Sequence, residues 1–137
     1  MIKRYNYQNL LHSVRHTIKG SRAQKIWKNS KYLIDAGIST PSALGYINKY
    51  KYGFYKTSCI IHEYVNTDNL VSFISQKLLD DNALNRLFTF CDKLKKSFNH
   101  HKISHNVLKP ANILINDEKI YLVDLDGMCI HKFKFLF

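Results

Sequence analysis

Hydrophobic side chains recur at helical spacing in two long stretches of the chain. Residues 21–36 begin with a serine suited to an N-cap and end before Gly37, which is suited to a C-cap. Residues 82–99 follow Asp80 and Asp81, either of which can cap a helix, and repeat apolar side chains about every 3.6 positions. The apolar faces predicted to belong to a core are Ala23, Ile26, Trp27, Leu33 and Ile34 in the first helix, and Leu84, Leu87, Phe88, Cys91, Leu94 and Phe98 in the second.

Shorter alternating or apolar runs predict strands. They occupy residues 2–7, 43–50, 57–65, 113–115 and 119–123. Tyr52 and Gly53 predict a hairpin turn, and residues 116–118 predict a second one. Weaker helical patterns cover residues 9–19 and a short segment that is capped within 66–68 and ends at Gln76. This mixture of helices and hairpins predicts an α+β fold.

Composition limits the class of protein. A chain of 137 residues, 45% hydrophobic and 13% aromatic, is expected to fold as one globular domain. Three widely spaced cysteines suggest no disulfide framework and fit a reducing cytosol. The polar start predicts no signal peptide, and the apolar runs are too short for a transmembrane span.

The formal net charge of +11 favours polyanionic partners. Nucleic acid, anionic lipid and phosphorylated glycolipid all fit this charge, and so does a lysine-rich surface with no partner. Lys132 and Lys134 lie among phenylalanines in a C-terminal tail that could contact anionic lipid or serve no role. Because no segment resembles a nucleic-acid-binding module, nucleic acid is not predicted as a partner.

The candidate catalytic and metal-binding residues are concentrated in two segments, SHNVLKPANILI (residues 104–115) and YLVDLDG (residues 121–127). Phosphotransferases related to protein kinases carry H-x-D-L-K-P-x-N, then a hairpin, then a metal-binding Asp. Asp124 follows Asn112 by 12 residues, and Val107 stands where the catalytic Asp is expected. The residues in register with the pattern are His105, Leu108, Lys109, Pro110, Asn112 and Asp124.

The chain resembles the bacterial lipopolysaccharide core kinases, the Kdo/heptose kinase and InaA-like group. Besides the two segments above, the resemblance is carried by IKRYN (2–6), SRAQKIWKNSKYLIDAGISTPSAL (21–44) and IIHEYV (60–65), so it covers nearly the whole chain. It implies a partial kinase-like domain over residues 1–137, made of an N-lobe remnant with an antiparallel sheet, a helix and the hinge (1–65), and a truncated, mainly helical C-lobe with the catalytic-loop hairpin (66–137).

The resemblance also implies roles for single residues. Lys3 would pair with the phosphates of ATP, and backbone groups near Glu63 and Val65 would contact the adenine. Asn112 and Asp124 would hold Mg²⁺ through hard oxygen ligands. Asp126 would add a supporting carboxylate, and Lys109 would lie close to the transferred phosphate. His105 would orient the backbone of the loop. Two alternatives stay open. Lys3 could be one surface lysine among many, with no role in binding ATP, and Asn112 and Asp124 could only cap turns.

Three departures from the pattern predict impaired catalysis. Val107 has no lone pair to accept a proton, a loss that typically costs ~10²–10⁴-fold in rate. Asn106 could hydrogen-bond a hydroxyl but would not deprotonate it. The five glycines form no G-x-G-x-x-G, and the only glutamates, Glu63 and Glu118, lie outside the helix that would supply an ion-pair partner for Lys3. Because only two residues precede Lys3 and only 13 follow Asp124, the chain is also expected to be truncated at both ends relative to the family that it resembles.

The resulting prediction is a lipopolysaccharide kinase-like protein whose ancestral reaction is ATP-dependent phosphorylation of a Kdo or heptose hydroxyl. Its expected place is the cytoplasm or the surface of the inner membrane. The alternative is a non-catalytic pseudokinase that binds Mg·nucleotide or a protein partner.

Overall fold

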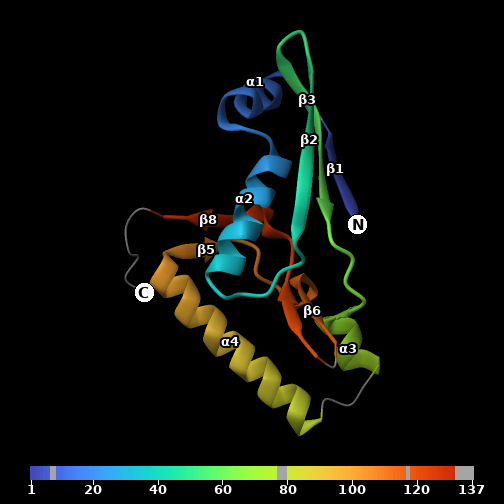
Figure 1. The fold of residues 1–137 in the computed structure, drawn as a ribbon, viewed down its shortest axis with the longest axis vertical. Helices are drawn as coiled ribbons and strands as arrows, with labels where there is room; N and C mark the ends of the chain where they lie inside the picture. The colour runs from blue at the N-terminus through green and yellow to red at the C-terminus, as the bar shows by residue number, and fades with distance from the viewer. Residues whose placement is uncertain (7–8, 77–79, 117, 132–137) are drawn as a thin grey trace. The chain divides into compact units, whose positions relative to one another are not determined.

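The computed structural model describes residues 1–6, 9–76, 80–116 and 118–131. It divides into two compact units: residues 1–32 with 41–64 (the first unit), and residues 33–40 with 65–137 (the second unit). Antiparallel sheets and helices occur together, so the predicted α+β class is confirmed (Figure 1). Among the described residues, no helix is both long and apolar enough to cross a membrane.

The first unit contains a three-stranded antiparallel sheet in the order β1-β3-β2. Its strands are β1 (Ile2–Asn6), β2 (Ala43–Lys51) and β3 (Phe54–His62). The predicted hairpin turn is confirmed: Tyr52 and Gly53 have φ angles of 53° and 79°, as a two-residue type I′ turn requires.

The predicted third strand, residues 57–65, has the wrong bounds. It begins at Phe54 because the tight turn joins it directly to β2. It ends at His62 because its partners run out there: Ile2 pairs with Ile61, and Ala43 pairs with His62. The lengths of neighbouring strands therefore set a boundary that the apolar run in the sequence overshoots.

Two helices follow β1, α1 (Leu10–Lys19) and α2 (Arg22–Asp35). Ser21 caps α2 as predicted, since its Oγ accepts from the Gln24 N–H at 3.0 Å, and Asn9, which was not predicted as a cap, caps α1 by accepting from the His12 N–H at 2.8 Å. Of the predicted apolar face of α2, Ala23, Ile26 and Leu33 are buried and Trp27 is half-buried, but Ile34 is exposed.

Gly37 ends α2 as predicted. Its φ of 77° lies in the left-handed region, its N–H donates to Ile34 O, and the Ile38 N–H donates to Leu33 O. This pair of bonds is a Schellman motif, which also buries Leu33 and Ile38. The motif buries these two side chains, whereas Ile34, in the same last turn of the helix, is left exposed.

The second unit contains α3 (Leu70–Gln76) and α4 (Asp81–His101). The cap of α3 is Asn69, whose Oδ1 accepts from the Ser72 N–H at 2.9 Å, so the prediction of a cap within 66–68 is wrong. Asp80 caps α4 by accepting from the Ala83 N–H at 2.7 Å. Of the two aspartates considered, the first is therefore the cap.

The predicted apolar stripe of α4 is wrong in part. Phe88 is 67% exposed and Cys91 is exposed, whereas the buried positions are Ala83, Phe90, Leu94 and Ser97. The small side chain of Ser97 lets its Oγ donate to the Ala36 carbonyl at 3.0 Å. Both the predicted stripe and the buried positions have helical spacing. The prediction was based on the larger apolar side chains, and these are not all on the face of α4 that is buried.

Five short strands complete the second unit. One sheet has the order β4-β6-β7, from β4 (Asp68–Asn69), β6 (Ile113–Ile115) and β7 (Ile120–Leu122). A separate pair joins β5 (Ile103–His105) to β8 (Met128–Ile130). The β6–β7 hairpin was predicted, and Asn116 Oδ1 stabilises its turn by accepting from the Glu118 and Lys119 N–H groups. The β5–β8 pair was not predicted.

Candidate functional site

The loop at residues 106–109 connects β5 to a 3₁₀ turn (Pro110–Asn112) and is folded back on itself. The Val107 N–H donates to the His105 Nδ1 at 3.3 Å, and Asn112 Nδ2 donates to the Val107 carbonyl at 2.8 Å. At the other side, the Asn106 N–H donates to the Gly127 carbonyl at 3.1 Å. His105 thus orients the loop backbone, which is the role that the sequence resemblance implied for it.

Asn112 joins this loop to the acidic turn. The residue is buried, and its carbonyl accepts from the Val123 N–H at 2.8 Å, directly before Asp124. Its side-chain nitrogen is bound to Val107, so the Oδ1 atom is the side-chain group left for a ligand. Within the described part of the chain, no hydrogen bond uses that oxygen.

Asp124 has an unusual backbone conformation, with φ 59° and ψ 53°. Left-handed backbone in a residue other than glycine is uncommon and concentrates at functional sites. The side chain is exposed, and a short 3₁₀ turn (Leu125–Gly127) follows. The fold therefore places Asp124 directly after Val123, whose N–H is bonded to Asn112, in a left-handed conformation that Asp adopts more readily than most residues.

Gly127 is a residue whose role the sequence analysis missed. A Cβ atom at this position would lie 3.5 Å from both the His105 Cε1 and the Val107 backbone nitrogen. These are ordinary van der Waals distances, so the acidic turn packs against the loop here at a separation that an alanine side chain would also tolerate. The only signal in the sequence was its position directly after the two aspartates. We call His105, Val107, Asn112, Asp124 and Gly127 the catalytic-loop cluster.

The oxygen donors of this cluster suit a hard divalent cation. Asn112 supplies an amide oxygen, Asp124 a carboxylate, and the half-buried Asp126 lies two residues further along. Mg²⁺ is usually bound by one or two carboxylates and completes its shell with waters and substrate phosphates. The described residues contain no group of three or more His, Cys, Asp and Glu that could hold a metal.

The position of the expected base is chemically inert. Val107 lies on the surface of the loop and is 50% exposed, and its neighbours Asn106 and Lys109 are also exposed. A valine side chain can neither accept a proton nor hydrogen-bond a hydroxyl. The cluster thus has candidate metal ligands and a nearby cation, but no carboxylate where a base would stand.

The remaining predicted site residues are divided between the units. Lys3 is exposed on β1, opposite Ile60 in the register, and belongs to the first unit with Glu63. Val65 belongs to the second unit, with Lys109, Asn112 and Asp124. The Asn112 carbonyl accepts from the Val123 N–H, one residue before Asp124, and a site shared by Asn112, Asp124 and Lys3 stays a prediction.

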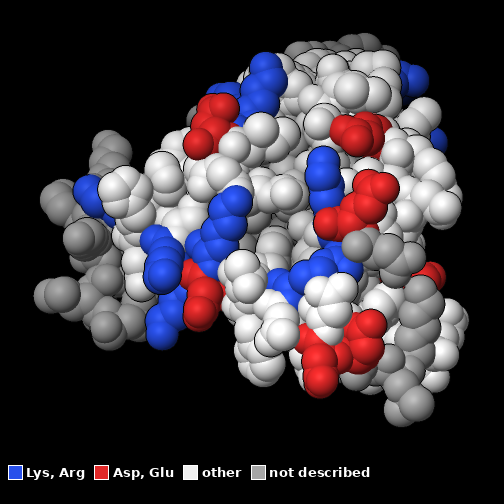
Figure 2. All heavy atoms as spheres, turned by 60° about the horizontal axis from the view of Figure 1, so that its bottom comes forward, with Lys and Arg blue, Asp and Glu red and all other residues white. Residues whose placement is uncertain are grey.

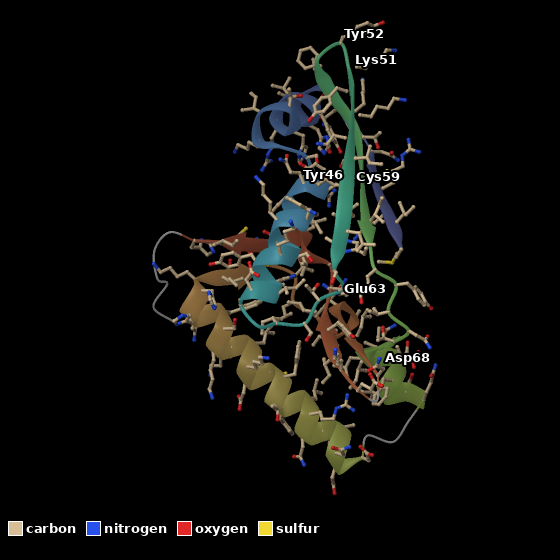
Figure 3. All side chains as sticks on the ribbon, viewed as in Figure 1. Tyr46, Lys51, Tyr52, Cys59, Glu63 and Asp68 are labelled. Carbon is tan, nitrogen blue, oxygen red and sulfur yellow. The ribbon has the colours of Figure 1, made fainter. Side chains whose placement is uncertain are left out.

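Glu63 uses its side chain for local structure. Its carboxylate accepts from the Ser42 N–H at 3.2 Å, and its own N–H donates to the Ser42 carbonyl at 2.9 Å. Figure 3 shows Glu63 at the end of β3 that lies away from Tyr52 and the hairpin turn. The contact of Glu63 with a nucleotide stays a prediction.

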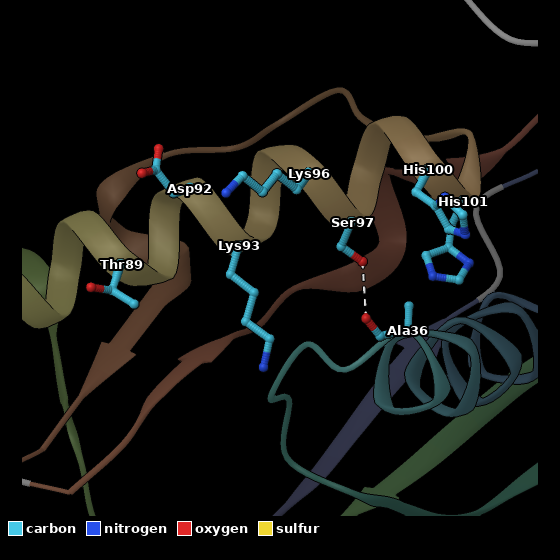
Figure 4. Close-up of a pocket in the computed structure, with 8 residues that line it drawn as sticks. All are labelled: Ala36, Thr89, Asp92, Lys93, Lys96, Ser97, His100 and His101. Atoms are coloured by element: carbon cyan, nitrogen blue, oxygen red, sulfur yellow. Dashed lines mark hydrogen bonds between the residues drawn. The ribbon is translucent and has the colours of Figure 1, made fainter.

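A groove of about 790 Å³ lies along α4, apart from the predicted site (Figure 4). None of the predicted site residues lines it. Its basic groups gather toward the C-terminal end of the helix, where cations interact favourably with exposed carbonyls. The lining residues are Ala36, Thr89, Asp92, Lys93, Lys96, Ser97, His100 and His101.

The loop at residues 106–109 is hydrogen-bonded both to Asn112 and to the acidic turn at Gly127. The chain belongs to the lipopolysaccharide kinase (Kdo/WaaP) family, whose sequence model matches residues 3–132. This confirms the resemblance derived from the sequence. Membership implies kinase-like function, general use of a nucleotide and a metal, and a glycolipid core substrate in general terms. A comparison with curated proteins gave no match.

Proposed function

We propose that this chain binds Mg·nucleotide through Asn112 and Asp124 and phosphorylates a Kdo or heptose hydroxyl of the lipopolysaccharide core only slowly. One observation carries the proposal. Asn112 bonds to the Val107 carbonyl through its side chain and to the Val123 N–H through its carbonyl, both at 2.8 Å. The metal ligands and the position of the missing base are therefore held in one small hydrogen-bonded cluster.

The expected division of labour follows from the chemistry of phosphoryl transfer. Such reactions depend on positioning and on stabilising the charge of the transferred group. Asn112 Oδ1 and the Asp124 carboxylate would hold the metal, which neutralises phosphate charge when it is bound. The exposed Lys109, at the start of the 3₁₀ turn, would add a positive charge near the transferred phosphate.

The acceptor side of the reaction is where the chain is deficient. A sugar hydroxyl is a poor nucleophile unless a base accepts its proton and orients it. Val107 can do neither, and general-base catalysis of this kind contributes typically ~10²–10⁴-fold. We therefore expect nucleotide binding to be retained and transfer to be slow.

The second candidate is a non-catalytic protein of the same family, a pseudokinase that binds Mg·nucleotide without turnover. The retained ligand pair and the half-exposed Val107 favour it equally. The two candidates share the binding site and differ only in whether phosphate reaches a sugar. The rate of phosphate transfer to a sugar, measured for variants of Val107, separates the two candidates.

Nucleotide binding is tested by thermal unfolding of the full chain with millimolar Mg·ATP. At a ligand concentration 100 times the Kd, binding should add about 2.7 kcal/mol to the free energy of unfolding. Asp124→Ala should abolish the increase in Tm. Asp92→Ala, which removes an exposed carboxylate on α4, is the matched control and should keep it. An unchanged Tm in the wild type, or an equal increase in Asp124→Ala, would refute the proposed site.

A further inference from the structure

The helix α1 is attached to the first unit by its polar face. Ser13 Oγ donates to the Tyr55 carbonyl at 2.6 Å, and the Tyr55 N–H donates to Thr17 Oγ1 at 2.9 Å. The rings of His12 and His16 lie 6.0 and 5.4 Å from the Tyr55 ring. Side chains that usually face water are therefore turned toward β3, which reverses the common orientation of an amphipathic helix.

The apolar side of α1 consequently faces solvent. At 100° per residue, its four aliphatic side chains fall within a sector about 100° wide. Most are strongly exposed: Leu10 67%, Leu11 83%, Val14 36% and Ile18 79%. A contiguous exposed apolar face of this kind marks an interaction site, because its exposure to water costs free energy that a partner would recover.

An aromatic turn lies next to this helix. Figure 3 shows Lys51 and Tyr52 at the free end of the β2–β3 hairpin, and Figure 1 places α1 beside that end of the hairpin. Tyr50, Tyr52 and Phe54 are 47%, 87% and 46% exposed, and Lys51 Nζ lies 5.3 Å from the centre of the Tyr52 ring. Tyrosine at such a position suits a boundary between apolar and aqueous surroundings.

The positive charge of the chain is concentrated in the same unit. Residues 1–32 and 41–64 contain 11 of the 21 Lys and Arg but only one of the 10 Asp and Glu. The first unit thus carries +10 of the formal +11. By contrast, the face in Figure 2, which turns the end with α3 and α4 forward, shows both signs of charge interspersed.

Two of these cations border the apolar face of α1. By helical geometry, Arg15 and Lys19 lie on one flank of the aliphatic sector. On the inner side, burial, followed by the nearby His16, Arg22 and Arg15 side chains, lowers the pKa of His12 below its usual value. His12 is therefore neutral near pH 7, and the positive charge of the helix lies on its outer side.

We infer that α1 and the β2–β3 hairpin tip form a surface that docks on an anionic lipid bilayer. We call this the α1 surface: Leu10, Leu11, Val14, Ile18, Tyr50, Tyr52 and Phe54. Aliphatic side chains would enter the boundary between headgroups and acyl chains, while Arg15, Lys19 and Lys51 would meet lipid phosphates. This inference does not depend on the proposed function.

Charge and polarity together select this occupant. Nucleic acid would satisfy the cations but leaves the aliphatic face without a partner. A second copy would bring one unit of charge +10 against another, which opposes association. An anionic bilayer supplies an apolar layer and negative charge at the same place, whereas an acidic protein would need a matching apolar groove.

The test is flotation of the full chain with vesicles of phosphatidylcholine that contain phosphatidylglycerol, compared with pure phosphatidylcholine. The wild type should bind the anionic vesicles, and added salt should weaken binding. Leu11→Gln with Ile18→Gln should weaken binding at least tenfold, because both side chains would be buried in lipid. Arg15→Gln with Lys19→Gln should weaken it by about fivefold for each charge removed.

The control is Phe88→Gln, which removes an equally exposed apolar side chain from the second unit and should bind like the wild type. All altered side chains are on the surface, and circular dichroism checks that each variant is folded. Every variant keeps the C-terminal tail, so the tail cannot produce a difference between them.

Four results of the experiments on this chain and its vesicles would overturn the inference, and a fifth concerns an acidic protein. They are the absence of wild-type binding, equal binding to neutral vesicles, unchanged binding of the Leu11→Gln, Ile18→Gln variant, and capture of the α1 surface by a second copy instead of lipid. Capture by a second copy would appear in sedimentation as a dimer of the wild type that does not bind vesicles. The Leu11→Gln, Ile18→Gln variant would abolish this dimer. An acidic protein that binds the α1 surface while vesicles do not would overturn it in the same way.

Discussion

Val107→Asp should raise the rate of phosphate transfer from ATP to a lipopolysaccharide core acceptor by about 10²–10⁴-fold. The substitution restores a carboxylate at the position where kinases of this pattern hold their base. The structure favours tolerance of the change, because Val107 is 50% exposed and its backbone is already held by His105 and Asn112. The rate is measured with radiolabelled ATP and acceptors that carry Kdo or heptose.

Two further variants identify the cause of any gain. Val107→Asn offers similar size and polarity but cannot accept a proton at neutral pH, so it should stay close to the wild-type rate. Adding Asp124→Ala to Val107→Asp should remove the gain, because the metal ligand would be lost. If the wild type already turned over at about 1–100 s⁻¹, as ordinary kinases do, the claim of impaired catalysis would be wrong.

Val107→Asp also separates the two candidate functions. A gain of transfer would mean that the acceptor site is still formed and that only the base is missing. Tight nucleotide binding with no transfer in Val107→Asp would instead favour the pseudokinase. No binding and no transfer in either protein would contradict both.

Tyr55→Ala should destabilise the first unit by about 3–5 kcal/mol, the usual cost of removing a large buried aromatic side chain. Tyr55 is fully buried, and its hydroxyl lies 3.2 Å from the Tyr5 carbonyl and 3.0 Å from Ser58 Oγ. Its backbone is also the attachment point of α1. Urea unfolding monitored by circular dichroism measures the free energy of unfolding.

A graded series checks that this cost comes from packing. Tyr55→Phe keeps the ring and should cost only about 1 kcal/mol, since Thr57 Oγ1 also donates to the Tyr5 carbonyl. Tyr52→Ala, at an exposed turn, should change stability by no more than about 0.5 kcal/mol. If Tyr55→Ala were as mild as Tyr52→Ala, the described packing of β1, β3 and α1 would be wrong.

The local features of the fold could be predicted from the sequence. Caps at Asn9, Ser21 and Asp80, the C-terminal Gly37 and the turn at Tyr52 all depend on residues within a few positions of one another. The hydrogen-bonded arrangement of the loop at residues 106–109 is local in the same way, because its residues lie within two short segments, and its role as a site stays a prediction. Their bonding through Asn112 follows from a loop and a hairpin that are close in the chain.

Features that depend on distant partners were missed. The end of β3 is set by where β1 and β2 begin, and the buried face of α4 is set by what packs against it. The orientation of α1 was hidden for the same reason: its polar residues bond to Tyr55, which lies far along the chain. Periodicity shows that a helix has an apolar side, but not whether that side is covered.

The most direct test of the central claim is a titration of Mn·ATP, followed by the enhancement of water proton relaxation that occurs when the complex binds protein. Mn²⁺ replaces Mg²⁺ here because it accepts the same oxygen ligands. We predict one site per chain, retained in Asn112→Asp, which keeps an oxygen ligand, and lost in Asn112→Leu, which has none. Equal binding by Asn112→Leu and the wild type would contradict the claim that Asn112 and Asp124 hold the metal.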